Sequence, residues 1–210
     1  RRLRGVGPGY NEAMNRITHW IDGRRTQPGT GPAGPVYNHA TGQKASEVEF
    51  ASAAVVDQAV ASALKAFPAW RATSLSRRAE IMFKFRELLN ARKADVAALL
   101  TAEHGKVPSD ALGELARGIE NVEFACGAPQ LLKGGFSEQA ATGVDVYSIR
   151  QPLGVVAGIT PFNFPAMVPL WMLSNAIVCG NTFVLKPSEK DPSAAMLLAE
   201  LLAEAGLPAG

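Results

Sequence analysis

Residues 153–186 read LGVVAGITPFNFPAMVPLWMLSNAIVCGNTFVLK, and this stretch decides the fold class. It begins and ends with short apolar runs, residues 153–160 and 182–186, which are typical of parallel strands covered on both faces. Between them, residues 165–179 are long enough for a helix, which Gly180 can end. The order strand, helix, strand indicates the beginning of a doubly wound sheet.

A second helix is expected after the second strand. Asp191 is of a residue type that caps helices, Pro192 suits the first turn and Gly206 suits the end. Its inward-facing positions are Leu197, Leu198, Leu201 and Leu202. The given sequence stops where a third strand is expected, and two strands do not form a stable parallel sheet alone. We therefore expect an incomplete Rossmann-like sheet that is completed by further polypeptide or by partners.

The region before this sheet is predicted to be mostly helical. Ser52 is an N-cap candidate, Pro68 is expected to end or kink the first helix, and Ser76 opens the second. Gly105 is a C-terminal stop, and a further helix begins near Pro108. The apolar spacing predicts inward-facing residues at Val56, Ala59, Val60, Ala63, Leu64, Phe67, Ile81, Phe85, Leu88, Leu89, Val96, Leu99, Leu100, Leu112, Leu115, Ala116, Ile119, Val122 and Cys126.

Two segments have the pattern of extended chain. Short strands near residues 36–38 and 46–50, with Thr41-Gly42 in the turn, predict a hairpin. Residues 144–151 (VDVYSIRQ) are expected to form another strand, which Pro152 interrupts. The chain is therefore predicted to be an α/β protein with a helical N-terminal region.

Composition excludes several classes of protein. The formal net charge of the 210 residues is +2, which is too small to favour nucleic acid or a membrane surface as partner. No apolar run reaches the roughly 18 residues that a transmembrane helix needs. Cys126 and Cys179 do not make a disulfide framework, and neither has a second ligand at metal-binding spacing. We therefore expect no metal site, and we interpret Cys126 as a core residue.

The N-terminal residues do not resemble a secretory signal. Residues 1–13 contain three arginines but no apolar core, and Met14 looks like a natural start. The GVGPG run at residues 5–9 mimics a phosphate-binding loop, but no strand precedes it and no helix follows. Residues 1–15 are therefore expected to be a disordered extension.

The turn after the first strand of the sheet, residues 158–165, carries the most informative polar residue, Asn163. Ligands of open α/β sheets bind at this carboxyl end of the strands. A side-chain amide fixed there can donate a hydrogen bond to a developing oxyanion. Alternatively, Asn163 bonds the turn itself or caps the following helix.

The end of the second strand carries a lysine and a carboxylate. Lys186 and Glu189 can bind a ribose, with the lysine donating and the carboxylate accepting hydrogen bonds. The alternative is a solvated loop with a surface ion pair.

Together these motifs resemble the aldehyde dehydrogenase superfamily, over about residues 16 to 210. The resemblance is carried by ITPFNFP at 159–165, FVLKPSE at 183–189, the ATG turn at 40–42, AFPAWR at 66–71 and HGK at 104–106. It implies that Asn163 is the oxyanion-hole asparagine. It also implies an NAD site lined by Ile159, Thr160 and Phe162, with the adenosine ribose bound by Lys186 and Glu189.

Within the superfamily, the chain is most similar to methylmalonate-semialdehyde dehydrogenases. Many relatives have tryptophan at the position of Phe162, and the segments 117–129 and 181–193 also fit this branch. The resemblance implies that Arg117 recognises the substrate carboxylate, a role suited to a planar bidentate donor. The alternative is that Arg117 is a cation on a helix surface.

The resemblance also implies the reaction. A cysteine thiolate attacks the aldehyde, hydride passes to NAD, and coenzyme A as co-substrate takes the acyl group while carbon dioxide is lost. From malonate or methylmalonate semialdehyde the products are acetyl-CoA or propionyl-CoA. The catalytic cysteine and the general-base glutamate are expected beyond Gly210, so the chain alone is predicted to be inactive and to bind NAD poorly.

The resemblance further implies a division of the chain. Residues 16–132 would be the helical N-terminal part of the NAD-binding domain, 133–152 a bridging hairpin for a homotetramer, and 153–210 the truncated sheet. Two other functions remain open: another semialdehyde or betaine-aldehyde dehydrogenase, or a remnant that only binds nucleotide or assembles. The expected location is a bacterial cytoplasm, or the mitochondrial matrix if the source is eukaryotic.

Overall fold

The computed structural model of the protein describes residues 16–210. The expectations for residues 1–15, including the GVGPG run at 5–9 and the start at Met14, lie outside the described residues. Among the described residues, no helix combines the length and the apolar character needed to cross a bilayer.

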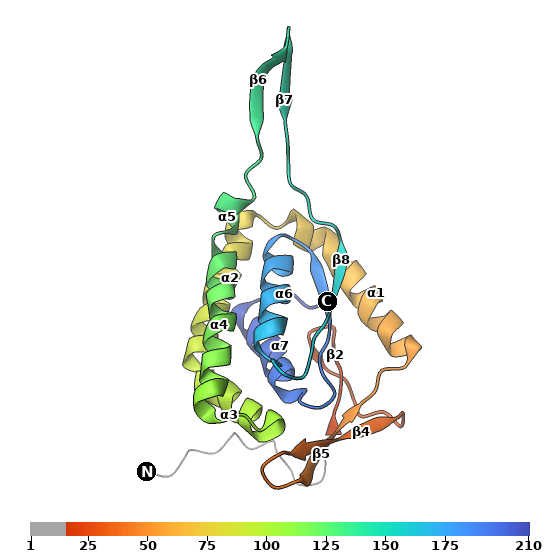
Figure 1. Ribbon diagram of the computed structural model, residues 1–210. Helices are drawn as coiled ribbons and strands as arrows, with labels where there is room; N and C mark the ends of the chain where they lie inside the picture. The colour runs from red at the N-terminus through yellow and green to blue at the C-terminus, as the bar shows by residue number, and fades with distance from the viewer. Residues whose placement is uncertain (1–15) are drawn as a thin grey trace.

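The C-terminal part confirms the predicted order of strand, helix, strand and helix. Strand β8 (Val155–Ile159) pairs in parallel with β9 (Thr182–Lys186). Helix α6 (Met167–Val178) connects them, and α7 (Ser193–Ala205) follows β9, as Figure 1 shows. The four leucines predicted to face inward on α7 are all buried. The mixed α/β fold class is therefore confirmed.

The sheet is less completely covered than the apolar runs predict. Leu153 precedes β8 and is 91% exposed, and Ile159 at the end of β8 is 78% exposed. Helices α1 and α6 both contact the two strands, but they leave the two ends of the first apolar run exposed. Apolar composition alone did not show that these ends reach solvent.

Asp191 does not cap α7, contrary to the prediction from the sequence. The helix begins at Ser193 after Pro192. Its first amide and hydroxyl are bonded by Glu103, whose carboxylate accepts from Ser193 N at 3.0 Å and from Ser193 Oγ. A carboxylate from a distant helix thus takes the place of the local cap.

The helical N-terminal region consists of α1 (Ala53–Ala72), α2 (Leu75–Ala91), α3 (Lys93–His104), α4 (Pro108–Cys126) and the short α5 (Ala128–Leu131). Side chains of α2, α3 and α4 pack with those of α6 and α7 in one core. The predicted ends at Gly105 and Pro108, and the burial of Cys126, are confirmed.

Two details of the helices differ from the predictions. Helix α1 continues through Pro68 to Ala72, and α2 is capped by Ser74 rather than opened at Ser76. The Ser52 cap of α1 is confirmed, because its side chain accepts a hydrogen bond from Val55 N.

Helix α1 also buries fewer apolar residues than its spacing predicts. Val56, Val60 and Leu64 are exposed, while Ala63 and Trp70 are buried. Trp70 anchors the helix by donating a hydrogen bond to Ile177 O at 3.0 Å. Since the sheet beneath α1 has only two strands, it covers one side of the helix and leaves the other apolar positions open. On α4, Leu112 and Ala116 are likewise exposed.

The remaining strands lie near the N-terminus and in a projecting arm. Strand β4 (Ala33–Asn38) pairs with β5 (Gln43–Glu49), which confirms the first hairpin, and β1 (Arg16–Ile17) pairs with β5 in parallel. A second small pair joins β2 (Trp20–Ile21) and β3 (Arg24–Arg25).

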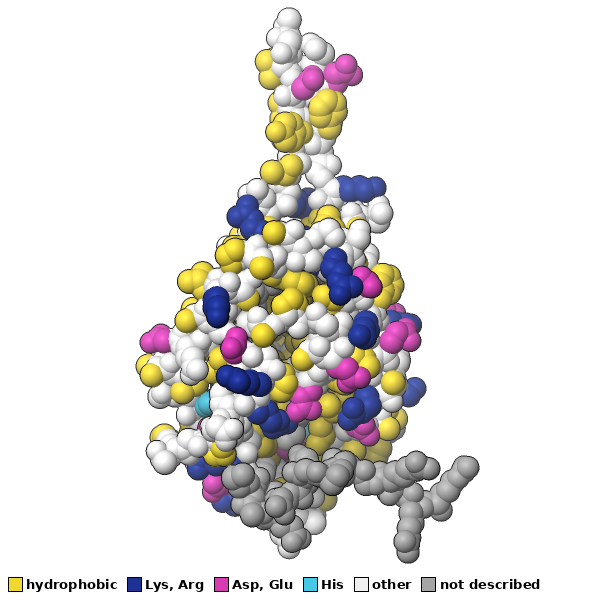
Figure 2. All heavy atoms as spheres, turned by 180° about the vertical axis from the view of Figure 1, so that it is seen from behind, with side chains coloured by type: hydrophobic (Ala, Val, Ile, Leu, Met, Phe, Trp, Pro, Cys, Tyr) yellow, Lys and Arg dark blue, Asp and Glu magenta, His cyan; other side chains and the backbone are white. Residues whose placement is uncertain are grey.

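The projecting arm is the hairpin of β6 (Phe136–Ala141) and β7 (Val144–Tyr147). The second strand ends at Tyr147, not at Gln151 as the sequence suggested. All residues of both strands are exposed, and hydrophobic side chains gather on the arm (Figure 2).

Candidate functional site

The two predicted motifs leave the sheet at the same end. Ile159 is the register partner of Lys186, and Thr160 N donates a hydrogen bond to Lys186 O at 3.1 Å. Both strands run in parallel, so the turn after β8 and the loop after β9 start side by side at the carboxyl edge. Asn163 and the Lys186–Glu189 couple therefore belong to one rim of the molecule.

Lys186 and Glu189 form an exposed ion pair, with Nζ and Oε2 at 2.9 Å. The pKa of Glu189 is lowered, first by its own backbone N–H and then by Lys186. The carboxylate is therefore ionised at neutral pH. Such a surface ion pair was the alternative to ribose binding that the sequence left open. Because both groups are exposed, they are also accessible to a ligand.

Apolar side chains stand beside this pair. Ile159 at the end of β8 is largely exposed, and Phe162 is 50% exposed. Between them Thr160 is buried, and its Oγ1 has no hydrogen-bond partner among the described residues. The rim thus offers apolar surface next to one hydroxyl, one lysine and one carboxylate.

The side-chain amide of Asn163 is not used by the turn. Within residues 16–210 it makes no hydrogen bond, and the residue is exposed. It does not cap α6 either, because the cap residue is Ala166 and the first amides of the helix are bonded by Glu114. The amide is therefore free to donate to a ligand.

A buried ion pair lies on the other side of the Asn163 turn. Glu114 of α4 is 0% exposed and pairs with Lys106 from the loop before α4. One oxygen, Oε1, accepts from Ala166 N at 2.9 Å and Met167 N at 3.1 Å. Lys106 Nζ also donates to Asn163 O at 3.0 Å. The pair thus joins the helical region to the turn.

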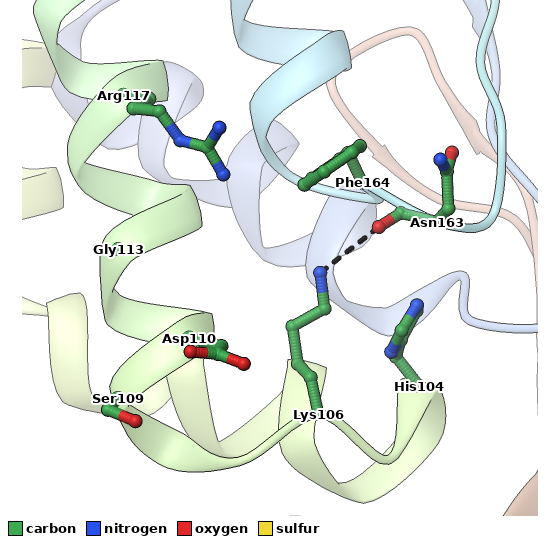
Figure 3. A pocket seen from close by; sticks show the side chains of 8 residues that line it. All are labelled: His104, Lys106, Ser109, Asp110, Gly113, Arg117, Asn163 and Phe164. Atoms are coloured by element: carbon green, nitrogen blue, oxygen red, sulfur yellow. Dashed lines mark hydrogen bonds between the residues drawn. The ribbon is translucent and has the colours of Figure 1, made fainter.

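A pocket of about 640 Å³ opens between this turn and the start of α4. Figure 3 shows the side chain of Lys106, from the loop before α4, and that of Arg117, from α4 itself, reaching toward Phe164. The ring of Phe164 lies between them, with Lys106 Nζ 4.7 Å and Arg117 Cζ 5.3 Å from its centroid. The pocket is lined by His104, Lys106, Ser109, Asp110, Gly113, Arg117, Asn163 and Phe164.

Close packing of two helices brings Arg117 to this pocket. A Cβ at the next residue, Gly118, would lie 2.5 Å from Leu170 Cδ1 of α6. Glycine at this position therefore lets α4 approach α6. Trp171 Nε1 then donates to the backbone oxygen of Arg117 at 3.3 Å, which ties the two helices together beside the guanidinium.

Phe162, on the far side of Asn163, also contacts a cation. Lys190 Nζ lies 4.5 Å from the ring centroid of Phe162, and the ring of His104 stacks on it at 6.2 Å. The pKa of His104 is lowered, mainly by burial and then by the charge of Lys106. A neutral His104 is thus favoured at physiological pH.

Neither cysteine belongs to this site. Cys126 is buried, Cys179 is partly buried, and neither lines the pocket. Burial raises the pKa of both thiols, which disfavours the reactive thiolate.

Sequence reasoning alone missed Lys106, Glu114 and Phe164 as parts of the site. One signal was available: Glu114 falls between Ala111 and Leu115 on the inward stripe of α4. A carboxylate at a core position needs a partner, and such a partner is most often a basic residue or backbone amides.

The family follows from comparison with known proteins. Residues 27–210 match the model of the aldehyde dehydrogenase family. The chain belongs to this family. A malonate-semialdehyde dehydrogenase of Pseudomonas aeruginosa is 50% identical over 197 residues, which are 94% of this chain and 39% of the relative. An acylating, mitochondrial methylmalonate-semialdehyde dehydrogenase of Arabidopsis thaliana is 50% identical over 83% of this chain and 29% of the relative.

Solved structures agree with this membership of the aldehyde dehydrogenase family. The methylmalonate-semialdehyde dehydrogenase of Oceanimonas doudoroffii has a TM-score of 0.91 and 54% identity, covering 93% of this chain and 40% of its own. A protein of Sinorhizobium meliloti described as a putative methylmalonate-semialdehyde dehydrogenase, complexed with NAD, has the same TM-score and 50% identity, covering 95% of this chain and 40% of its own. The chain therefore spans about two fifths of the length of these relatives.

Proposed function

We propose that this chain is part of an NAD-dependent enzyme that oxidises malonate or methylmalonate semialdehyde to acetyl-CoA or propionyl-CoA, with loss of carbon dioxide. The observation that carries the proposal is the unbonded amide of Asn163, a residue that lines the same pocket as Arg117. The amide stabilises the oxyanion that forms at the aldehyde carbon, while the guanidinium binds the distant carboxylate. The relatives' names support the same substrates.

The rim fits NAD as the cofactor, which accepts the hydride when it is bound. Lys186 and Glu189 are exposed and close enough to each other to form hydrogen bonds with the same ribose. Ile159 and Phe162 offer exposed apolar surface to the rings, and Thr160 adds a buried hydroxyl that lacks a partner. The unpaired hydroxyl supports a bound ligand, because a buried polar group without a hydrogen-bond partner is costly.

The remaining parts of the reaction need groups that this chain does not supply. Both of its cysteines have raised thiol pKa values and lie outside the pocket. We propose that the nucleophilic cysteine, the general base and the binding of coenzyme A come from the part of the relatives' length that this chain does not span. Residues 1–210 alone are then inactive. The bacterial relatives favour a cytoplasmic enzyme, and a eukaryotic source would favour the mitochondrial matrix.

The pocket favours an anionic aldehyde over a cationic one such as betaine aldehyde. Arg117 lines it together with Lys106, whose charge is paired with Glu114, and Asp110 is the one acidic residue among its lining side chains. The ring of Phe164, which could attract a cationic substrate, already faces these two cations. A positively charged substrate would therefore meet repulsion from Arg117.

Replacing Arg117 by alanine in the complete polypeptide tests the substrate. We expect kcat/KM for malonate semialdehyde to fall about ten- to hundredfold, as for loss of a hydrogen bond to a charged group. The value for propionaldehyde, which has no carboxylate, should change little. NADH formation measured with and without coenzyme A gives these values. The matched control is Arg77→Ala, which removes an exposed arginine from a pair with Glu80. Equal losses on both aldehydes would contradict the role of Arg117.

The projecting hairpin is proposed to pair with another copy of the chain, as in the tetramer implied by the family. Its strands β6 and β7 expose Phe136, Val144, Val146 and Tyr147. An isolated two-stranded hairpin with exposed apolar side chains is marginally stable in water. A strand or surface from a neighbouring copy would cover these side chains and pair the open edges.

A further inference from the structure

One buried ion pair holds the backbone at two points of the segment from Asn163 to Met167. Glu114 Oε1 accepts from Ala166 N and Met167 N, at 2.9 and 3.1 Å. Glu114 Oε2 is bound by Lys106 Nζ, which also donates to Asn163 O at 3.0 Å. Backbone groups at both ends of the Asn163–Met167 segment are therefore bonded to the same pair.

The same pair also orients the ring that follows Asn163. Lys106 Nζ lies 4.7 Å from the centroid of Phe164, and Arg117 lies against the same ring. In Figure 3 the Asn163 side chain points away from Lys106, while its backbone oxygen points toward it. Lys106 thus binds the backbone oxygen of Asn163 and leaves the side-chain amide of the same residue free.

We infer that Lys106 and Glu114 are positioning residues for Asn163. They fix the turn so that the amide is already aimed when the oxyanion forms. The inference rests on the proposed role of Asn163 as oxyanion donor. A buried ion pair is weak support for stability, because desolvation offsets much of its attraction. A donor held in advance, in contrast, avoids reorganisation during the reaction.

A double-mutant cycle separates positioning from a purely structural role. In the complete polypeptide, Lys106→Met should lower kcat about ten- to hundredfold with little change in the KM of the aldehyde, because small misplacements have effects of this order. In the Asn163→Ala background the same change should have no further effect, since no amide remains to be aimed. If the double variant loses kcat by the product of the two single-variant factors, Lys106 and Asn163 act independently, and the inference is overturned. Lys44→Met, from the exposed pair with Glu47, is the matched control.

A second variant covers the case in which Lys106→Met does not fold. Lys106→Met combined with Glu114→Gln removes both charges, and the glutamine oxygen can still accept from Ala166 and Met167. The same cycle is then run with this pair. Amide exchange in the unchanged protein adds an independent measurement. The amides of Ala166 and Met167 should be protected, and exchange as fast as in an open loop would also overturn the inference.

These measurements distinguish failure of the inference from failure of the proposed function. The cycle can use any aldehyde that the enzyme oxidises, for example propionaldehyde. If the enzyme oxidises propionaldehyde but neither semialdehyde, the proposed substrate is wrong. The double-mutant cycle, run with propionaldehyde, still tests whether Lys106 and Glu114 position Asn163. If no aldehyde is oxidised, the proposed function fails, and amide exchange still decides whether the pair holds the turn.

Discussion

Replacing Asn163 by alanine in the complete polypeptide is expected to lower kcat by about two to three powers of ten, the usual loss for one oxyanion donor. The amide has no bond to other described residues, so its loss leaves no buried group unpaired. The free energy of unfolding should therefore change by less than about 0.5 kcal/mol. Steady-state NADH formation and denaturant unfolding measure the two quantities.

The contrast between rate and stability is what makes this variant informative. A structural asparagine would lose stability first and rate only as a consequence. Asn90→Ala is the control, because Asn90 is an exposed asparagine on α2 that donates to Arg86 O at 3.1 Å. It should leave kcat unchanged. An unchanged kcat in Asn163→Ala would defeat the oxyanion assignment.

Elements with local signals were predictable from the sequence. The end of α3 at Gly105 was correct because left-handed backbone, here φ +88°, favours glycine and stops a helix. The strands β8 and β9 were correct because their apolar runs are too short for a typical helix and contain β-branched residues, which favour strands. Likewise, the shared rim of Asn163 and Lys186 follows from parallel strands, whose carboxyl ends meet at one edge.

Features that depend on distant residues were not predictable. Glu103 replaces Asp191 as the cap of α7 from 90 positions away. Glu114 bonds the turn at Ala166 from 52 positions away. Periodicity also showed that α1 has an apolar stripe, but not which part of it the rest of the protein would cover. Val56 was therefore predicted to face inward, although it is exposed. The local sequence pattern does not contain information about contacts between residues that are far apart in the chain.

Asp191→Asn is expected to remove a strong pH dependence of stability. Asp191 is 2% exposed, and Oδ1 has no hydrogen-bond partner among the described residues. Burial raises its pKa from 3.8 to about 7, helped by the negative charges of Glu103 and Glu114 and opposed by Ser188 and Lys106. Replacement by a neutral amide of the same shape leaves no charge to desolvate.

The direction of the effect follows from proton linkage. Between about pH 4 and pH 7 the folded protein keeps the Asp191 proton that the unfolded chain has released. The contribution of this carboxyl to stability is therefore full below about pH 4 and is lost as the pH rises through about 7. Three pH units at about 1.36 kcal/mol each set an upper bound of about 4 kcal/mol. Above pH 7 the wild type carries the whole penalty.

Denaturant unfolding of wild type and Asp191→Asn, measured from pH 5 to pH 8.5, tests this. The variant should be the more stable protein at pH 8, and its advantage should shrink steadily toward pH 5. Asp57→Asn, which removes an exposed carboxylate on α1, should show no such convergence. Curves for wild type and Asp191→Asn that stay parallel would mean that Asp191 is ionised in the folded protein throughout. The carboxylate would then need a donor beyond the described contacts, and the loop that presents Lys186 and Glu189 would be held by that donor.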